Sequence, residues 1–220
     1  MIKWPNRKVI GNKMKNKMDL IIRPENKNDY REVENLTREA FWDIYKPGCD
    51  EHLVVHKIRN TPDFIPELDL IVEHNGKIVG NIIYSKSKVV TADNRECEVI
   101  TFGPVTVLPS LQNRGIGSVL IEQTKEMAKN MGYKAIFIFG NPGYYHRFGF
   151  ENAKIFGIST PEGANPDAFM GLELHKGSLK DIRGKLYMSP LFEVSKEELE
   201  AFEKNFPYKE KHVTDTQLKL

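Results

Sequence analysis

The chain has 220 residues, of which 40% are hydrophobic and 28% charged, and its formal net charge is +2 at pH 7. This balance is typical of a globular domain, and so small a charge gives no reason to expect a nucleic-acid or membrane partner. Two cysteines, Cys49 and Cys97, are too few for a disulfide framework or a cysteine metal site, which favours a cytoplasmic location. No apolar run approaches the roughly 20 residues of a membrane-spanning helix.

The first seventeen residues contain six basic side chains and no acidic one. Their apolar residues are too sparse for a signal peptide. We expect a disordered leader over residues 1–17, with the main domain beginning near Met18. The alternative, a basic arm that binds nucleic acid, lacks a supporting aromatic or periodic pattern.

The domain is expected to begin with a strand over residues 19–23 and two helices. Asn28 or Asp29 is a candidate cap for the first helix, whose apolar residues recur three and four apart as far as Phe41. Asp50 is the candidate cap of the second helix, after a break at Pro47-Gly48. Phe41 and its aromatic neighbours Trp42 and Tyr45 are expected in the core, with an acceptor pocket as the alternative.

A hairpin and a bulged strand follow. Asn75-Gly76 predicts a tight turn between strands over residues 68–73 and 77–90, because both turn positions tolerate positive φ. The next strand, over residues 97–107, contains Gly103-Pro104. Proline cannot donate to a ladder, so this dipeptide predicts a bulge.

A helix over residues 115–131 connects that strand to a continuous apolar strand over 134–139. A crossover of this length predicts that the two strands run parallel. The expected core-facing side chains of the helix are Ile116, Val119, Leu120, Gln123, Met127 and Met131. Gly132 is its expected C-terminal cap. Further strands are expected over residues 154–158 and 169–174.

The tail contains one well-marked helix. Ser195 and Glu198 form a capping box, and Pro207 ends the helix. An apolar face of Leu199, Phe202 and Phe206 favours a helix docked on the domain. Beyond Lys209 the chain is polar and expected to fray.

The turn between Val107 and the central helix is a candidate anion site. The first N–H groups of a helix have no partner inside it, and the helix dipole is positive there. Gly115 and Gly117 lack a Cβ, so a phosphate can approach the backbone closely, with Gln112 and Arg114 at the rim. The run lacks the Gly-Lys-Ser/Thr of a P-loop and the third glycine of a Rossmann fingerprint. Taken alone, it fits a diphosphate site and an unliganded turn equally.

Two motifs together resemble the GNAT superfamily of acetyl-CoA-dependent N-acetyltransferases. The first is the strand Val105–Pro109 followed by Gln112-x-x-Gly115-x-Gly117. The second is residues 141–150, Asn-Pro-Gly-Tyr-Tyr-His-Arg-Phe-Gly-Phe, which resembles the family's short helix ending in Gly-Phe, in the form of a bacterial subgroup. Two motifs in the right order, about thirty residues apart, are more specific than either one. The resemblance covers roughly residues 19–179.

The resemblance implies an α/β fold, a central mixed β-sheet flanked by helices, in which two parallel strands splay apart. It also implies that acetyl-CoA is the co-substrate, with its pantetheine arm between those strands and its diphosphate at the helix start. No metal is implied. The residues expected to bind acetyl-CoA are Val105, Thr106, Val107, Gln112, Asn113, Arg114, Gly115, Ile116, Gly117, Ser118, Asn141 and Tyr145.

Tyr145 matches the family's general-acid tyrosine, four residues before Gly149, and would assist the leaving thiolate. The alternative for Tyr145 is an aromatic side chain that only packs under Phe148 and Phe150, and Tyr144 is the spare candidate for the acid. The base is harder to name, because Thr101 stands where some relatives have a glutamate. Glu98, earlier on the same strand, is the first candidate.

Glu73 and His74, at the end of a neighbouring strand, are weaker candidates for the base, and a water chain could serve instead. His52 and His56 lie one helical turn apart, a spacing that suits a metal, but no third ligand is apparent. An exposed helix face is therefore the expected place for both histidines.

We therefore expect a leader over residues 1–17, an N-acetyltransferase domain over 18–180 and an extension over 181–220. The expected reaction transfers an acetyl group from acetyl-CoA to a primary amine of a small molecule or peptide, by direct attack in a ternary complex. A homodimer is compatible with the sequence. The alternatives are a non-catalytic acyl-CoA-binding module, favoured by the missing strand acid, and a nucleic-acid-associated protein that uses the basic leader.

Overall fold

The computed structural model describes residues 8–9, 18–215 and 217. Their strands are β1 (Lys8–Val9), β2 (Leu20–Pro24), β3 (Leu70–His74), β4 (Lys77–Thr91), β5 (Glu96–Val107), β6 (Ala135–Phe139), β7 (Glu151–Asn152), β8 (Ile158–Ser159), β9 (Phe169–Glu173) and β10 (Gly184–Tyr187). Their α-helices are α1 (Tyr30–Phe41), α2 (Glu51–Arg59), α3 (Ile116–Asn130), α4 (Pro142–Tyr145) and α5 (Lys196–Glu203). Short 3-10 helices are η1 (Pro66–Leu68), η2 (Pro109–Leu111), η3 (His146–Phe148), η4 (Ala153–Phe156) and η5 (Pro190–Phe192).

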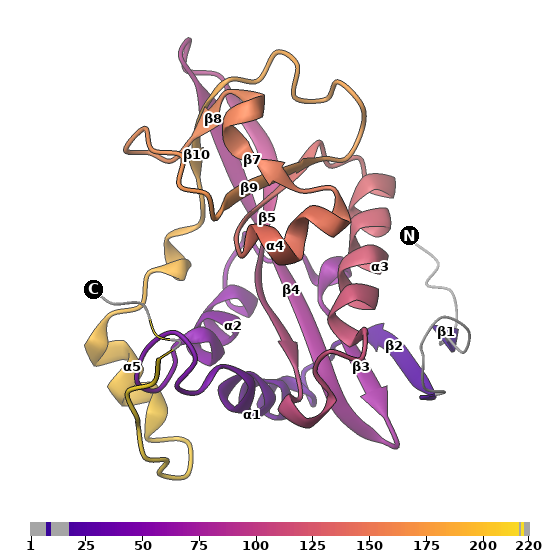
Figure 1. Ribbon diagram of the computed structural model, residues 1–220, viewed down its shortest axis with the longest axis vertical. Coiled ribbons are helices and arrows are strands. Elements are labelled where there is room, and N and C mark those ends of the chain that lie inside the picture. The colour runs from indigo at the N-terminus through magenta and orange to yellow at the C-terminus, as the bar shows by residue number, and fades with distance from the viewer. Residues whose placement is uncertain (1–7, 10–17, 216, 218–220) are drawn as a thin grey trace.

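The strands form one mixed sheet in the order β1-β2-β3-β4-β5-β6-β9-β7, and β10 joins the far end of β4 to β8. β4 runs the length of the molecule, pairing with β3 where it begins and with β10 where it ends (Figure 1). The expected hairpin turn is confirmed, because Asn75 and Gly76 have φ values of 51° and 74°. Of the expected leader, the structure describes only Lys8 and Val9, which pair with β2, and the rest of residues 1–17 lies outside the described residues.

Helices cover both faces of the sheet. Side chains alternate along a strand, so Leu70 and Val72 of β3 pack in the cluster that contains α3, whereas Ile71 packs in the cluster formed by α1 and α2. The two clusters form a core on each side of the sheet. α1 and α2 therefore lie on the face opposite α3.

The centre of the sheet opens between β5 and β6. These strands run parallel, as the crossover predicts, but they pair only at Ile100↔Ile136 and Thr101↔Phe137. Past Thr101 the register of β5 with β4 shifts. An advance of two residues on β4, from Ile82 to Tyr84, lies opposite an advance of three on β5, from Phe102 to Val105. This extra residue confirms the bulge expected at Gly103-Pro104. The end of β5 thus pairs with β4 on one side and has no strand partner on the other.

The core face of α3 is broader than the sequence pattern predicted. Val119, Met127 and Met131 are partly buried and pack against the core cluster that contains α3, and Gln123 is partly buried. The buried side chains of the helix include Ile116, Leu120, Ile121, Thr124 and Ala128. Thr124 reads as polar in the sequence, but its hydroxyl bonds to Leu120 O and lies 2.9 Å from Tyr84 Oη, so its burial leaves no unpaired group. Gly132, with a φ of 87°, follows the helix as expected.

Two other expectations need correction. Residues 153–156 form η4 rather than a strand, because the Asn152 side chain accepts the Lys154 N–H at 3.0 Å and Gly157 ends the turn in a left-handed conformation. β10 was not expected at all. It lies in the C-terminal extension and pairs antiparallel with residues 88–91 of β4.

The C-terminal helix docks on α1 and α2. The capping box of Ser195 and Glu198 is present, and Phe206 is buried. The segment beyond Lys209 does not fray within the described residues. The indole Nε1 of Trp42 donates to Glu210 O at 2.8 Å, and Thr214 Oγ1 donates to Asp43 O at 3.0 Å. The tail therefore holds the segment that connects α1 to α2.

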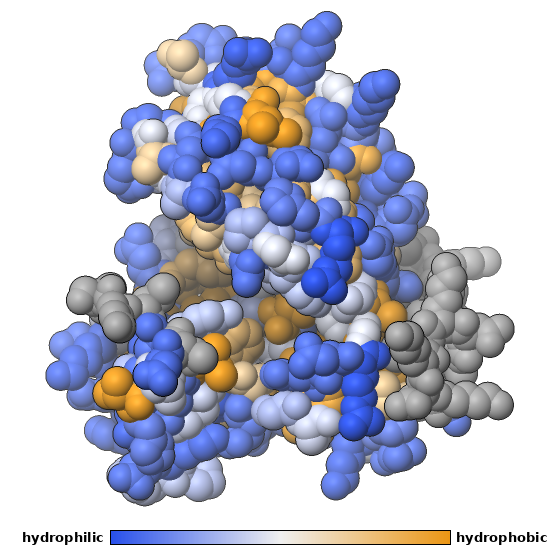
Figure 2. All heavy atoms as spheres, viewed as in Figure 1, coloured by the Kyte–Doolittle hydropathy of each residue, from blue (hydrophilic) through white to orange (hydrophobic). Residues whose placement is uncertain are grey.

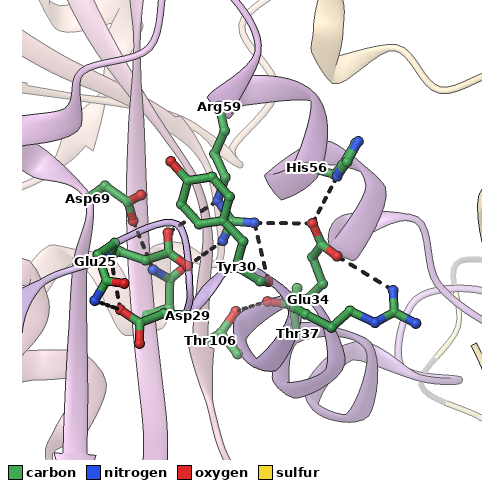
Figure 3. Close-up of polar contacts among 12 residues, drawn as sticks. Glu25, Asp29, Tyr30, Glu34, Thr37, His56, Arg59, Asp69 and Thr106 are labelled. Carbon is green, nitrogen blue, oxygen red and sulfur yellow. Dashed lines mark hydrogen bonds and ion pairs between the residues drawn. The ribbon is translucent and has the colours of Figure 1, made fainter. Parts of the chain in front are cut away.

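A buried network of charges fixes α1, α2 and the start of β3 to one another. The Arg59 guanidinium of α2 lies between two carboxylates, with Nη2 2.5 Å from Glu25 Oε1 and Nη1 3.2 Å from Glu34 Oε1 (Figure 3). The same Glu34 oxygen lies 2.8 Å from His56 Nδ1. Burial, followed by its contact with Asp69, raises the pKa of Glu25 to about 10. The Glu25–Asp69 pair therefore holds a proton at neutral pH, which reduces the cost of burying two carboxyl groups side by side.

Within the described part of the chain, no helix has both the length and the apolar character needed to cross a bilayer.

Candidate active site

A cavity of about 860 Å³ lies where β5 and β6 separate. It is lined by the end of β5, the start of α3, the end of β6, α4 and the segment from α1 to α2. Figure 2 shows this face of the molecule hollowed between α4 and α1, with hydrophobic surface inside the hollow. A cavity of this size at the centre of an α/β sheet is typical of a small-molecule site.

The start of α3 opens into this cavity with free main-chain donors. Gly115 precedes the helix in a left-handed conformation with a φ of 88°, and no side chain caps the helix. The first backbone bond at this end is from Val119 N–H to Gly115 O. Within the described residues, the N–H groups of residues 113–118 donate to no protein acceptor. A 15-residue helix with unpaired donors at its start attracts an anion.

The absence of a side chain at Gly117 leaves space at the start of α3. A Cβ built there would lie 3.1 Å from Tyr144 Oη and 3.6 Å from side-chain carbons of Val105 and Val107. Any larger side chain at residue 117 would therefore project into the cavity. The guanidinium of Arg147, 4.7 Å from the centre of the Tyr144 ring, adds a positive charge on the same side.

The structure brings most of the residues expected to bind the co-substrate into one cavity. They are Val105, Val107, Gln112, Asn113, Gly115, Ile116, Gly117, Ser118, Asn141 and Tyr145. Thr106 and Arg114 are not among the lining residues. The Thr106 side chain points to the opposite face of β5, where its Oγ1 lies 3.0 Å from Thr37 Oγ1, and Arg114 is exposed.

Tyr145 lies in an aromatic cage beside the opening of the sheet. Its ring packs against Phe102, Phe150 and Tyr144. A Cβ at Gly140 would overlap the Tyr145 ring, so the glycine at the end of β6 allows this position. Burial raises the pKa of Tyr145, and the phenol is therefore neutral and able to donate a hydrogen bond at physiological pH.

Glu51 also lines the cavity, although no sequence pattern indicated a role for it. It occupies the first position of α2, where an acidic side chain is common because it complements the helix dipole. Its Oε2 accepts the Asp50 N–H at 3.1 Å. Burial raises the pKa of Glu51 to about 7. Only the fold, which packs α2 against β5, shows that Glu51 lines the cavity.

The candidate bases from the sequence lie elsewhere. Glu98 is exposed and pairs with Lys86 at 3.7 Å, outside the cavity. Glu73 pairs with Arg23 at 2.7 Å, and His74 is bonded to Asp19 O. Thr101 does line the cavity, with its hydroxyl 2.8 Å from Ser87 Oγ. Alternation along β5 and the sheet pairing therefore keep Glu98 and Glu73 away from the reacting groups.

The two histidines of α2 were expected on an exposed face, which is wrong for His52. Its side chain is fully buried, with Nε2 2.8 Å from Glu203 Oε1 and rings of Phe202 and Phe206 beside it. Burial lowers the pKa of His52 to about 4, so it is neutral at pH 7. In the described residues, no group of three or more His, Cys, Asp or Glu side chains is arranged to hold a metal ion.

Comparison with known families decides the identity of this fold. The acetyltransferase (GNAT) domain family matches residues 21–153. The chain belongs to the GNAT acetyltransferase family. It is therefore an acetyl-CoA-dependent acetyltransferase, with acetyl-CoA as its co-substrate, as the two motifs indicated.

Two Escherichia coli relatives are similar in sequence. The chain is 32% identical over 87 residues to the uncharacterized N-acetyltransferase YjhQ, a match that spans 39% of this chain and 47% of that protein. It is 24% identical over 166 residues to the uncharacterized N-acetyltransferase YhbS, spanning 75% of this chain and 93% of that protein.

Solved GNAT structures share the fold. The E. coli YhbS structure, in complex with CoA, has a TM-score of 0.71 and 22% identity, covering 80% of this chain and 92% of that one. A GNAT acetyltransferase from Brucella melitensis, in complex with acetyl-CoA, has a TM-score of 0.65 and 24% identity, covering 80% of this chain and 99% of that one.

Proposed function

We propose that this protein transfers the acetyl group of acetyl-CoA to a primary amine by direct attack within a ternary complex. The observation that carries the proposal is the row of unpaired N–H donors of residues 113–118, which opens into the central cavity. Such donors stabilise a diphosphate without any basic side chain. The relatives crystallised with CoA and acetyl-CoA support a ligand of this class.

The gap between β5 and β6 suits the pantetheine arm. Past Thr101 the edge of β5 has no partner in β6, so its main-chain groups can pair with an extended ligand as they would with another strand. Val105 and Val107 line the cavity along this edge. Asn141, which caps α4 through a 2.9 Å bond to Gly143 N–H, lies across the gap.

In this arrangement Tyr145 assists the departure of the thiolate. A free thiol has a pKa of about 8.5 and a tyrosine about 10, and burial raises the pKa of Tyr145 further. Full proton transfer from Tyr145 to sulfur is therefore uphill. Its role is to donate a hydrogen bond to the developing thiolate, while main-chain N–H groups of the splayed strand stabilise the oxyanion.

Direct attack is favoured over an acetyl-enzyme because no thiol faces the thioester. The chain has two cysteines. Cys49 is buried, and burial raises the pKa of its thiol, which disfavours the nucleophilic thiolate. Cys97 lies on β5 outside the cavity-lining residues. The rate enhancement then comes mainly from holding amine and thioester together.

The test combines thiol release with intact-protein mass. We expect thiol release from acetyl-CoA only when a primary amine is added, and no mass increase of the protein with acetyl-CoA alone. An acetylated protein that passes its acetyl group to amine would contradict direct attack. Binding of acetyl-CoA with no thiol release for any amine would identify an acyl-CoA-binding module instead.

A further inference from the structure

The cavity has two ends of opposite charge. At one end are the N–H donors that begin α3 and the guanidinium of Arg147. At the other end is the carboxyl of Glu51, the sole carboxyl side chain among the described residues that line the cavity. The positive end suits the anionic co-substrate. The negative end is formed by α2, on a different element from the N–H donors that begin α3.

Glu51 has no cationic partner within the described residues. The neighbouring Lys46 pairs with Asp50 instead, and Glu51 accepts only main-chain N–H groups. A partly buried carboxyl without a cation is costly to ionise. A ligand that brings one positive charge to this point would therefore be stabilised there.

The rest of this end of the cavity is apolar. Phe41, Ile44, Tyr45 and Val54 come from α1, α2 and the segment between them. Met188 and Phe192 come from the C-terminal extension, outside the residues that match the family. These six side chains and the Glu51 carboxyl are called the acceptor end below.

The extension is fixed rigidly enough to shape this end. Ser189 Oγ donates to Asp63 Oδ2 at 2.6 Å, and Leu191 is buried against α2. Lys57 of α2 bonds to Glu193 O at 2.9 Å. Met188 and Phe192 thus lie between anchored neighbours, and their size sets the room for the acceptor.

We propose that Glu51 binds the ammonium group of the acceptor and acts as the general base, and that the acceptor is a small amine with a single ammonium group on an apolar body. This inference rests on the proposed acetyl transfer. One carboxyl matches one ammonium, whereas a polyamine or an aminoglycoside would leave further ammonium groups against apolar side chains. An acidic amino acid would bring its own carboxylate beside Glu51.

The proton transfers balance. The Glu51 carboxylate takes one proton from the ammonium and later releases it to water. The freed amine lone pair forms a bond to the thioester carbon, and the carbonyl electron pair moves to oxygen. When that pair returns, the C–S bond breaks and the electrons leave on sulfur, beside the Tyr145 hydroxyl. The second proton, from the nitrogen of the adduct, passes to the thiolate, giving the amide and CoA.

The groups around Glu51 are consistent with this role. Burial, with a smaller contribution from the charge of Asp50, raises its pKa to about 7, against the lowering effects of main-chain hydrogen bonds and of Lys46. Burial, and after it the charge of Glu51, raises the pKa of Tyr45 and of Cys49. Burial, followed by Tyr144 and then Tyr45, raises the pKa of Tyr145. Glu51, Tyr45 and Tyr145 therefore share one electrostatic environment across the cavity, and a base with a pKa near 7 suits catalysis at neutral pH.

The first experiment compares Glu51→Gln with wild type, using 2-phenylethylamine as acceptor. We expect kcat/KM to fall about 100-fold or more at pH 7, while calorimetry gives the same acetyl-CoA affinity. The wild-type profile should fall below pH 7, where Glu51 is protonated, and this inflection should be absent from the variant. Raising the pH toward the pKa of the amine should narrow the difference in kcat/KM between wild type and Glu51→Gln, because the free amine no longer needs a base.

Two other variants complete the design. Glu126→Gln, on the exposed face of α3, is the matched control and should behave as wild type. Glu98→Gln tests the other glutamate. A wild-type pH profile in Glu51→Gln, or a loss of turnover in Glu98→Gln alone, would overturn the assignment of Glu51 while leaving acetyl transfer intact.

The second experiment compares acceptors. We expect kcat/KM for 2-phenylethylamine to exceed that for spermidine and for glutamate by about tenfold or more. Met188→Ala should shift the preference toward a bulkier arylalkylamine. A preference for spermidine, or for a peptide N-terminus over the small amine, would overturn the acceptor class. No thiol release with any amine would overturn the proposed function itself.

Discussion

Tyr145 illustrates how a residue's surroundings set its chemistry. The side chain is held by packing against Phe102 and Phe150 and by the absence of a side chain at Gly140. Burial raises its pKa, so the phenol keeps its proton and acts as a hydrogen-bond donor. Tyr144, the neighbouring candidate, has its hydroxyl beside Gly117 at the start of α3, where it is closer to the anion site.

We predict that Tyr145→Phe lowers kcat by about 10- to 100-fold, the value of one hydrogen bond to a developing charge. The acetyl-CoA dissociation constant should change by less than about twofold, because the ring and its packing remain. Steady-state kinetics and calorimetry separate the two effects. A larger loss of kcat in Tyr144→Phe than in Tyr145→Phe would transfer the role to Tyr144.

Sequence motifs singled out Tyr145 as a candidate but not Glu51, and the difference has a physical cause. Tyr145, Gly117 and Asn141 belong to local motifs, in which a turn or short helix determines the geometry within a few residues. Glu51 reaches the cavity through the packing of α2 against β5, a contact between residues about fifty positions apart in the sequence. Its position at the start of a helix predicts only a charge that complements the helix dipole.

Among the elements of the fold, the network around Arg59 joins α1, α2 and the start of β3. Glu25 and Asp69 contribute two carboxyl groups, and Arg59 and Asn81 supply donors to them. Sequence patterns predicted these helices and strands but not this network, because its members are polar residues scattered over residues 25–81. From sequence alone, charged residues are predicted to be exposed to solvent, and only the fold shows which of them are buried.

This network predicts a pH dependence of stability. The folded pKa of Glu25, about 10, lies above the unfolded value of 4.5, so between these values the folded state holds one proton more than the unfolded state. Stability from this group is therefore complete below pH 4.5 and falls as the pH rises toward 10, by at most about 1.4 kcal/mol per pH unit.

Glu25→Gln, which imitates the protonated carboxyl, should have a flatter dependence of Tm on pH between pH 6 and 9. Thermal unfolding of wild type and variant measures the two slopes, with the exposed Glu126→Gln as control. Equal slopes in wild type and Glu25→Gln would show that Glu25 carries no extra proton in the folded state.

At the scale of the whole molecule, a family domain is completed by its own extension. The residues that match the family supply the opened sheet and the start of α3. The extension adds β10 to the sheet and places Met188 and Phe192 at the acceptor end. The docked helix was predictable from its capping box and apolar face, whereas β10 was not, because four residues pair with a distant strand without a strong local pattern.

Gly117→Trp tests whether the main-chain amides at the start of α3 hold the diphosphate of acetyl-CoA. A tryptophan at this point fills the space beside Tyr144, Val105 and Val107. Circular dichroism and thermal unfolding should show a folded variant, and Glu126→Trp on the same helix is the matched control. We predict that calorimetry detects no binding of acetyl-CoA to Gly117→Trp and wild-type binding to the control. Unchanged affinity in a folded Gly117→Trp protein would contradict the account.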